Sequence, residues 1–86
     1  MNRDHVFQQA REVMARTFGV EPQSIVEATR ADDVEGWDSL SHLVVLTGIE
    51  RRLKIKLPLT EAYAAQDVGA LVDLATRIAI QQHPNA

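Results

Sequence analysis

The sequence predicts an all-α protein, a small four-helix bundle of three main helices and one short helix. Apolar residues recur at helical spacing in three long segments, and a residue suited to cap a helix precedes each of them. The one alternating segment, residues 54–58, has no partner strand, and a lone strand is not stable. Eighty-six residues fit one domain, 1–86, without room for a second core.

The first predicted helix spans residues 3–18. Asn2 before it is suited to cap the free backbone N–H groups at its start. Gly19 after it is suited to the left-handed conformation that ends many helices. Helical spacing places an apolar stripe on this segment, which we expect to face the core. The stripe consists of Val6, Ala10, Val13 and Thr17, with Phe7, Met14 and Phe18 alongside.

A connection of residues 20–37 separates the first two helices. Connections longer than about 12–15 residues are uncommon, and they are usually functional or held in place. We expect Ile25 and Val26 to hold this one by inserting into the core. We expect Trp37 to anchor its end, half-buried against the bundle.

The second helix is predicted over residues 39–53. Gly48 lies inside it and costs about 1 kcal/mol relative to alanine; either close packing or the approach of a partner would explain it. We expect Val44 and Thr47 to face solvent. The predicted period of the inward face runs through Leu40, Leu43, Leu46 or Thr47, Glu50 and Leu53.

Two further helices complete the predicted bundle. Residues 54–58 form an extended connector that leads to Pro58. We expect Thr60 to cap a short helix that runs to Ala65, with Tyr63 in a packing role, and Asp67 to cap the last helix. Residues 82–86 are expected to fray. The predicted inner face of the last helix comprises Val68, Leu71, Val72, Ala75, Ile78 and Ala79.

The composition excludes several classes of protein. Without cysteine there is no disulfide framework, thiolate metal site or thiol nucleophile. The three histidines lie far apart, which argues against a metal site. No apolar run approaches the roughly 20 residues that span a bilayer, and the N-terminus lacks the apolar region of a secretory signal. We therefore expect a cytoplasmic monomer without a metal or a membrane span.

The net charge of −3 is distributed unevenly along the chain. Between residues 21 and 38, six acids face Arg30 alone, which gives a local charge of −5. Between residues 50 and 56, four bases face Glu50 alone, which gives +3. The two regions are therefore expected to attract different partners.

The most informative motif is Gly36-Trp37-Asp38-Ser39-Leu40, where the acidic connection leads into the second helix. A serine at a helix start is first of all a capping residue. Here Asp38 can cap the helix already, which leaves the Ser39 hydroxyl free. Because N–H groups at a helix start carry partial positive charge, the position suits a covalently attached phosphate. We therefore interpret Ser39 as the mounting point of a prosthetic group rather than as a catalyst.

The block Asp38-Ser39-Leu40, with Leu43 and Leu53, resembles the attachment signature of acyl carrier proteins. Length, helix order and the long acidic connection extend the resemblance over most of the chain. The resemblance implies a non-catalytic carrier that receives 4′-phosphopantetheine on Ser39, transferred from coenzyme A by a phosphopantetheinyl transferase that uses magnesium. The arm of such carriers ends in a thiol, which holds acyl or aminoacyl groups as thioesters and presents them to partner enzymes.

The second helix departs from the usual pattern of this family. Carriers of fatty acid synthesis usually have several acids along it, whereas here residues 44–47 are uncharged and residues 51–52 are basic. Peptidyl carriers more often have glycine and histidine before the serine, where this chain has Trp37 and Asp38. The resemblance therefore favours a discrete carrier of a specialised pathway, loaded with an amino acid or a modified acyl group by its own ligase. The residues predicted for recognition are Asp38 and Leu40, for the transferase, and Val44, Thr47 and Arg51, for other partner enzymes.

Three other functions compete with this interpretation. Asp38, Ser39 and His42 are residue types of a hydrolase triad, but one exposed helical turn supplies neither a pocket nor an oxyanion hole. His42 is therefore expected at the surface or at a partner contact. The basic residues 51–56 would suit nucleic acid, but acids outnumber bases twelve to nine, so no nucleic-acid binding is expected. The remaining alternative is an unmodified helical interaction module.

Overall fold

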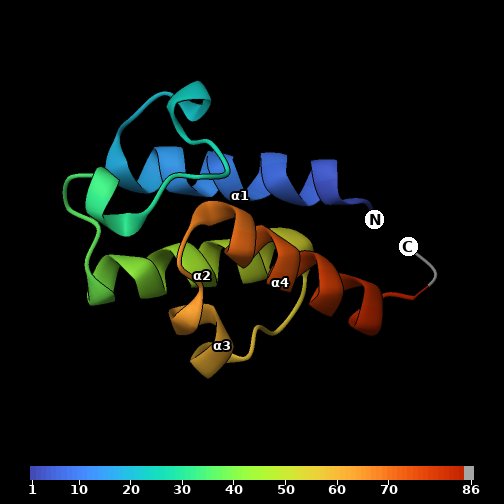
Figure 1. The fold of residues 1–86 in the computed structure, drawn as a ribbon. Coiled ribbons are helices and arrows are strands. Elements are labelled where there is room, and N and C mark those ends of the chain that lie inside the picture. Colours follow the sequence, from blue (N-terminus) through green and yellow to red (C-terminus); the bar gives the residue numbers. More distant parts are fainter. Residues whose placement is uncertain (85–86) are drawn as a thin grey trace.

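Four helices form the fold of residues 1–84, the part of the chain that the computed structural model describes (Figure 1). They are α1 (Arg3–Phe18), α2 (Ser39–Leu53), the short α3 (Leu59–Ala64) and α4 (Val68–Gln82). α1 and α2 lie side by side and antiparallel, and α4 packs against α1. Since the described residues contain helices and no strand, the predicted all-α fold is confirmed.

α1 begins and ends where its sequence predicts. The Asn2 side chain accepts a hydrogen bond from the backbone N–H of His5 at 2.8 Å, and Gly19 adopts a left-handed φ of 67°. Val13 on α1 faces Gly48 on α2, where an added Cβ would lie 2.6 Å from Val13 Cγ1. The close packing of these two helices therefore explains the glycine within α2.

The buried face of α2 differs from the predicted one. Leu40 is 74% exposed and Leu43 is 41% exposed, so the predicted inward period is wrong at both positions. Apolar residues surround most of this helix, and their spacing alone therefore does not single out the face that packs. The residues that α2 buries are Val45, Leu46, Ile49 and Leu53.

Lys54 ends α2 in a left-handed conformation with a φ of 55°, so the predicted connector begins one residue later, at Ile55. Its apolar side chains Ile55 and Leu57 are buried. α3 begins directly after Pro58, whose carbonyl accepts the first helical hydrogen bond from Ala62 N at 2.9 Å. The prediction that Thr60 caps α3 is therefore wrong. Proline has its φ fixed near the helical value, and it starts this helix without a side-chain cap. α3 ends at Ala64, one residue earlier than predicted.

α4 starts at its predicted cap, since Asp67 accepts a hydrogen bond from Ala70 N at 2.8 Å. All six residues of its predicted inner face are buried. At the other end, the Gln82 side chain bonds both the N–H and the carbonyl of Lys56, at 2.9 and 3.0 Å. Gln82 is thus tied to the connector, in contrast to the predicted fraying there; Asn85 and Ala86 of that tail lie outside the described residues.

The connection of residues 20–37 contains two short 3₁₀ turns, Pro22–Ser24 and Ala31–Asp33, and α1 holds its first part. The Arg11 guanidinium donates to the carbonyls of Pro22 and Ile25, at 3.1 and 2.7 Å. Ile25 is buried in the core, as predicted, whereas Val26 is 49% exposed. The predicted insertion of Val26 is wrong because successive side chains of an extended segment point in opposite directions.

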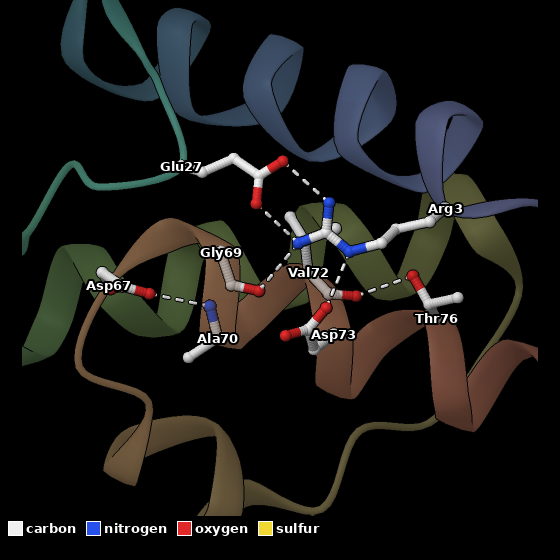
Figure 2. A network of polar contacts seen from close by, with 8 residues as sticks. All are labelled: Arg3, Glu27, Asp67, Gly69, Ala70, Val72, Asp73 and Thr76. Atoms are coloured by element: carbon white, nitrogen blue, oxygen red, sulfur yellow. Dashed lines mark hydrogen bonds and ion pairs between the residues drawn. The ribbon is translucent and has the colours of Figure 1, made fainter.

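Arg3 joins the same connection to α4 (Figure 2). Its guanidinium donates two hydrogen bonds to the Glu27 carboxylate, at 2.7 and 2.8 Å. It also donates to Asp73 at 2.7 Å and to the Gly69 carbonyl at 3.3 Å. The hydrogen bond from Arg3 is the main reason that the pKa of Glu27 lies below its ordinary value. One side chain thereby links α1, the connection and α4.

Backbone hydrogen bonds complete this junction between the connection and α4. The first N–H groups of a helix have no partner within the helix. In α4, Val68 N donates to the Thr29 carbonyl at 2.9 Å, and Gly69 N donates to the Glu27 carbonyl at 2.8 Å. The first two N–H groups of α4 are therefore paired with carbonyls of the connection.

Candidate functional site

The candidate site lies at the start of α2, where the acidic connection meets the helix. Gly36 adopts a φ of 88°, a conformation that favours glycine, just before the helix begins. The Asp38 carboxylate accepts a hydrogen bond from Ser41 N at 2.9 Å, and the Ser41 hydroxyl oxygen accepts one from Asp38 N at 2.8 Å. The predicted cap at Asp38 is confirmed. Sequence reasoning missed Ser41, although a polar side chain three residues after a cap is the signal of such reciprocal capping.

Ser39 is the first residue of α2, and its side chain is exposed. The chain contains three serines. The Ser24 hydroxyl donates to the Glu21 carbonyl at 2.7 Å, and the Ser41 hydroxyl donates to the Gly36 carbonyl at 2.9 Å. In contrast, the Ser39 hydroxyl has no hydrogen-bond partner among residues 1–84. Capping by Asp38 and Ser41 thus leaves this hydroxyl free.

The surroundings of Ser39 suit an attached phosphate and a flexible arm. Backbone N–H groups at the start of a 15-residue helix carry partial positive charge. The hydrogen bond from Ser41 N is the main cause that lowers the pKa of Asp38, so the charge of this carboxylate is engaged in the cap. A hollow of about 250 Å³ borders Ser39. The residues present therefore fit a phosphodiester on this hydroxyl.

Trp37 and His42 form a wall beside this hollow. The Trp37 ring stacks on Phe18 with centroids 4.8 Å apart, which confirms the predicted half-buried anchor. Its Nε1–H donates to His42 Nδ1 at 2.9 Å. The neutral imidazole then carries its proton on Nε2, which donates to the Ala62 carbonyl at 3.2 Å. His42 therefore links the connection to α3, and its half-buried ring borders the hollow beside Ser39.

No base among the described residues is directed at the Ser39 hydroxyl. Both ring nitrogens of His42 are occupied by other partners. The Tyr63 hydroxyl donates to the backbone carbonyl of Ser39 at 3.2 Å, and its ring meets the His42 ring edge-on at 5.0 Å. A serine nucleophile requires a base in hydrogen-bond contact. These residues therefore do not form a hydrolase triad.

Four of the residues predicted for partner recognition lie along one exposed stripe of α2. Leu40 is 74% exposed and Val44 is 54% exposed, and Thr47 and Arg51 are exposed as well. They line a groove between α1 and α2 of about 520 Å³. Asp38, the fifth predicted residue, lies at the helix cap instead. Sequence reasoning missed Arg16 of α1, which lines the same groove, because the sequence does not show which faces of two helices adjoin.

Residues 1–84 can be searched for a metal site and for a membrane span. These residues contain no group of three or more His, Cys, Asp or Glu side chains that could hold a metal ion. None of their helices has both the length and the hydropathy needed to cross a membrane. Of the basic residues that follow Glu50, Arg52 is paired with Glu12 at 2.6 Å, so it serves to join α2 to α1.

Comparisons with known proteins agree on this region of the chain. A family model described as the phosphopantetheine attachment site matches residues 8–75, a span that includes the start of α2. Among solved structures, the chain is similar to the solution NMR structure of a holo acyl carrier protein from Geobacter metallireducens. The TM-score is 0.77 and the sequence identity is 29%, over 94% of this chain and 93% of that one.

Proposed function

This chain belongs to the phosphopantetheine-binding family of acyl carrier proteins, and on that premise we propose that Ser39 is the residue that carries its 4′-phosphopantetheine arm. The observation that carries the proposal is the free, exposed hydroxyl of Ser39 at the start of α2. Ser24 and Ser41 are poorer candidates because each already donates its hydroxyl hydrogen to a backbone carbonyl.

The attachment is a transfer in which the Ser39 hydroxyl is the nucleophile. Its oxygen forms a bond to the phosphorus that bears the pantetheine in coenzyme A, and the bond from that phosphorus to the bridging oxygen of the diphosphate breaks. The hydroxyl proton passes to a base of the transferase, and adenosine 3′,5′-bisphosphate leaves. Among residues 1–84 no base is in contact with the Ser39 hydroxyl, so the transferase has to supply one.

When bound, the arm supplies a terminal thiol, on which an acyl or aminoacyl group is held as a thioester. The residues of this chain position the arm and do not catalyse the reactions of the cargo. Asp38 and Ser41 fix the first turn of α2, and Tyr63 donates to the Ser39 carbonyl. A flexible arm on this fixed base raises the effective concentration of cargo near a docked enzyme. The partners are a phosphopantetheinyl transferase, a ligase that loads the acyl or aminoacyl group and the enzymes that use it.

An intact-mass measurement tests the proposal. The protein is incubated with coenzyme A, magnesium and a broad-specificity phosphopantetheinyl transferase. We expect the wild-type chain to gain the mass of one phosphopantetheine and Ser39→Ala to gain none. Ser24→Ala is the matched control, because it removes a serine hydroxyl away from the start of α2, and it should still be modified.

Two outcomes would contradict the assignment. A full mass gain in Ser39→Ala would place the arm on another residue. Absence of any gain under conditions that modify a control carrier would favour the alternative, an unmodified helical interaction module. In that case the exposed α2 stripe, rather than Ser39, would be the functional part of the molecule.

A further inference from the structure

The groove between α1 and α2 is an unpartnered apolar surface next to the proposed attachment site. It begins beside Ser39 at Leu40, which is 74% exposed, and it extends along α2 past Val44, which is 54% exposed. An exposed leucine alone is ordinary, but contiguous apolar residues in a hollow mark an interaction site. We call this hollow the docking groove, and the residues that define it are Leu40, Leu43, Val44, Thr47, Arg16 and Arg51.

The spacing of the exposed residues on α2 is that of a second packing face. Leu40, Val44, Thr47 and Arg51 are separated by four, three and four residues, the step at which side chains line one face of a helix. The core stripe of Val45, Leu46, Ile49 and Leu53 lies on another face of the same helix. α2 therefore has two packing faces, and only one of them is covered within the described chain.

The rim of the docking groove is positively charged. Three arginines line it, and no acidic residue of the described part of the chain does. Arg52 is compensated by Glu12 at 2.6 Å, whereas Arg16 and Arg51 are exposed and form no ion pair with any carboxylate of residues 1–84. Two uncompensated cations beside an apolar floor favour a ligand that is apolar along its centre and negative along its edges.

From this complementarity we propose that the docking groove receives an acidic amphipathic helix of a partner enzyme. Its apolar stripe would pack on Leu40, Leu43 and Val44, and its carboxylates would pair with Arg16 and Arg51. An amphipathic helix that lays its apolar face in a hydrophobic groove is a common mode of recognition. The inference rests on the proposed carrier function, since a carrier must dock on the enzymes that load and unload it.

Charge argues against nucleic acid as the occupant. The acids Asp32, Asp33, Glu35 and Asp38 precede the same end of α2 at which the groove begins, and all four are exposed. They would repel a phosphate backbone, which is charged along its whole length, where it reaches Ser39. The proposed helix needs carboxylates only opposite Arg16 and Arg51. A second copy of this chain is likewise disfavoured, because a symmetric contact would bring the unpaired arginines of both copies into one interface.

The test is an NMR titration of the ¹⁵N-labelled full chain with two synthetic helices. Each has 15 residues, the length of α2, is stabilised as a helix by a side-chain lactam, and carries the same leucine stripe. One has glutamates flanking the stripe, and the other has lysines. We expect the glutamate helix at millimolar concentration to shift amide signals of residues 40–51 and of Arg16, with weaker binding at high salt. The lysine helix should leave them in place.

Charge reversal locates the contact. The double variant Arg16→Glu, Arg51→Glu should bind the glutamate helix roughly tenfold more weakly, the effect expected from losing two exposed ion pairs. It should also gain affinity for the lysine helix. Lys56→Glu is the control, since it makes the same charge change at an exposed residue outside the groove; it should leave affinity within about twofold. Circular dichroism confirms that each variant is folded.

Several results would overturn the docking proposal. The glutamate helix could cause no shifts, or both helices could bind equally well. The shifts could instead depend on protein concentration alone, or a DNA duplex could bind as well as the glutamate helix. The wild-type chain is also incubated with the transferase and coenzyme A. If wild-type Ser39 is modified while the glutamate helix fails to bind, the docking proposal alone is wrong; if wild-type Ser39 is not modified, the attachment assignment fails independently.

Discussion

The starts of α2 and α4 look alike in sequence but serve different ends. Each helix is preceded by an aspartate whose carboxylate accepts a hydrogen bond from the N–H three residues later, at 2.9 Å for Asp38 and 2.8 Å for Asp67. At α4, the next residue, Val68, is buried, and its N–H donates to a carbonyl of the connection. At α2, the next residue is the exposed Ser39.

The difference shows that a cap fixes where a helix starts but not what the start does. Carbonyls of the connection occupy the first N–H groups of α4, and Arg3 holds that connection in place (Figure 2). No such segment of residues 1–84 covers the start of α2, where Ser39 is exposed. The start of α4 is thus a structural contact with the connection, and the start of α2 is the proposed attachment site.

The largest effect on stability should come from truncating a buried residue at the start of α4, in contrast to an exposed residue in the first turn of α2. Val68 is 2% exposed and Leu40 is 74% exposed. Val68→Ala should therefore lower the free energy of unfolding by about 2 kcal/mol. Leu40→Ala removes a larger side chain but should change the free energy of unfolding by no more than about 0.5 kcal/mol. Urea denaturation monitored by circular dichroism measures both.

The two variants should also differ in function. Leu40→Ala is expected to weaken binding of the glutamate helix in the docking groove, whereas Val68→Ala should not. If Leu40→Ala destabilised the fold as much as Val68→Ala, the start of α2 would be packed like that of α4, and the contrast between the two helix starts would be lost.

A smaller effect should appear in how the free energy of unfolding depends on pH. The folded state lowers the pKa of Glu27, through Arg3, and the pKa of Asp38, through Ser41 N. The unfolded chain therefore binds more protons, so the stability these carboxylates contribute is present above their ordinary pKa and is lost as pH falls towards the lowered one. Glu27→Gln and Asp38→Asn should each reduce the loss of unfolding free energy as the pH falls. Asparagine still caps a helix, so Asp38→Asn should keep the fold at neutral pH.

The same experiment sharpens the comparison of the two helix starts. Glu27 belongs to the junction at α4, and Asp38 belongs to the start of α2. Only Asp38→Asn is expected to alter the rate of modification by the transferase, because Asp38 adjoins Ser39. An unchanged loss of unfolding free energy at low pH in both variants would mean that neither carboxylate is more stabilised in the folded chain than in the unfolded one.

Helix boundaries could be predicted from the sequence because the signals that set them are local. Asn2, Asp38 and Asp67 each lie beside the N–H groups that they cap, and the Ser39 motif lies within one turn of its cap. Thr60 was the exception, because Pro58 starts α3 through its fixed backbone rather than through a polar side chain.

The rest depended on contacts between distant segments. The face that α2 buries is decided by α1, whose Val13 packs on Gly48, and not by the apolar period of α2 itself. The role of His42 follows from the Trp37 ring and the Ala62 carbonyl, which only the folded chain brings together. The place of Arg16 in the docking groove has the same origin.

The central claim, that the uncovered start of α2 carries the arm on Ser39, is tested most directly on protein isolated from its native host. Trypsin cleaves after Arg30 and Arg51 and releases residues 31–51, a peptide that contains Ser39 and Ser41 and no other serine. Fragment-ion mass spectrometry then locates the phosphopantetheine. We predict that fragments separating the two serines place it on Ser39; its location on Ser41, or on a peptide outside residues 31–51, would contradict the claim.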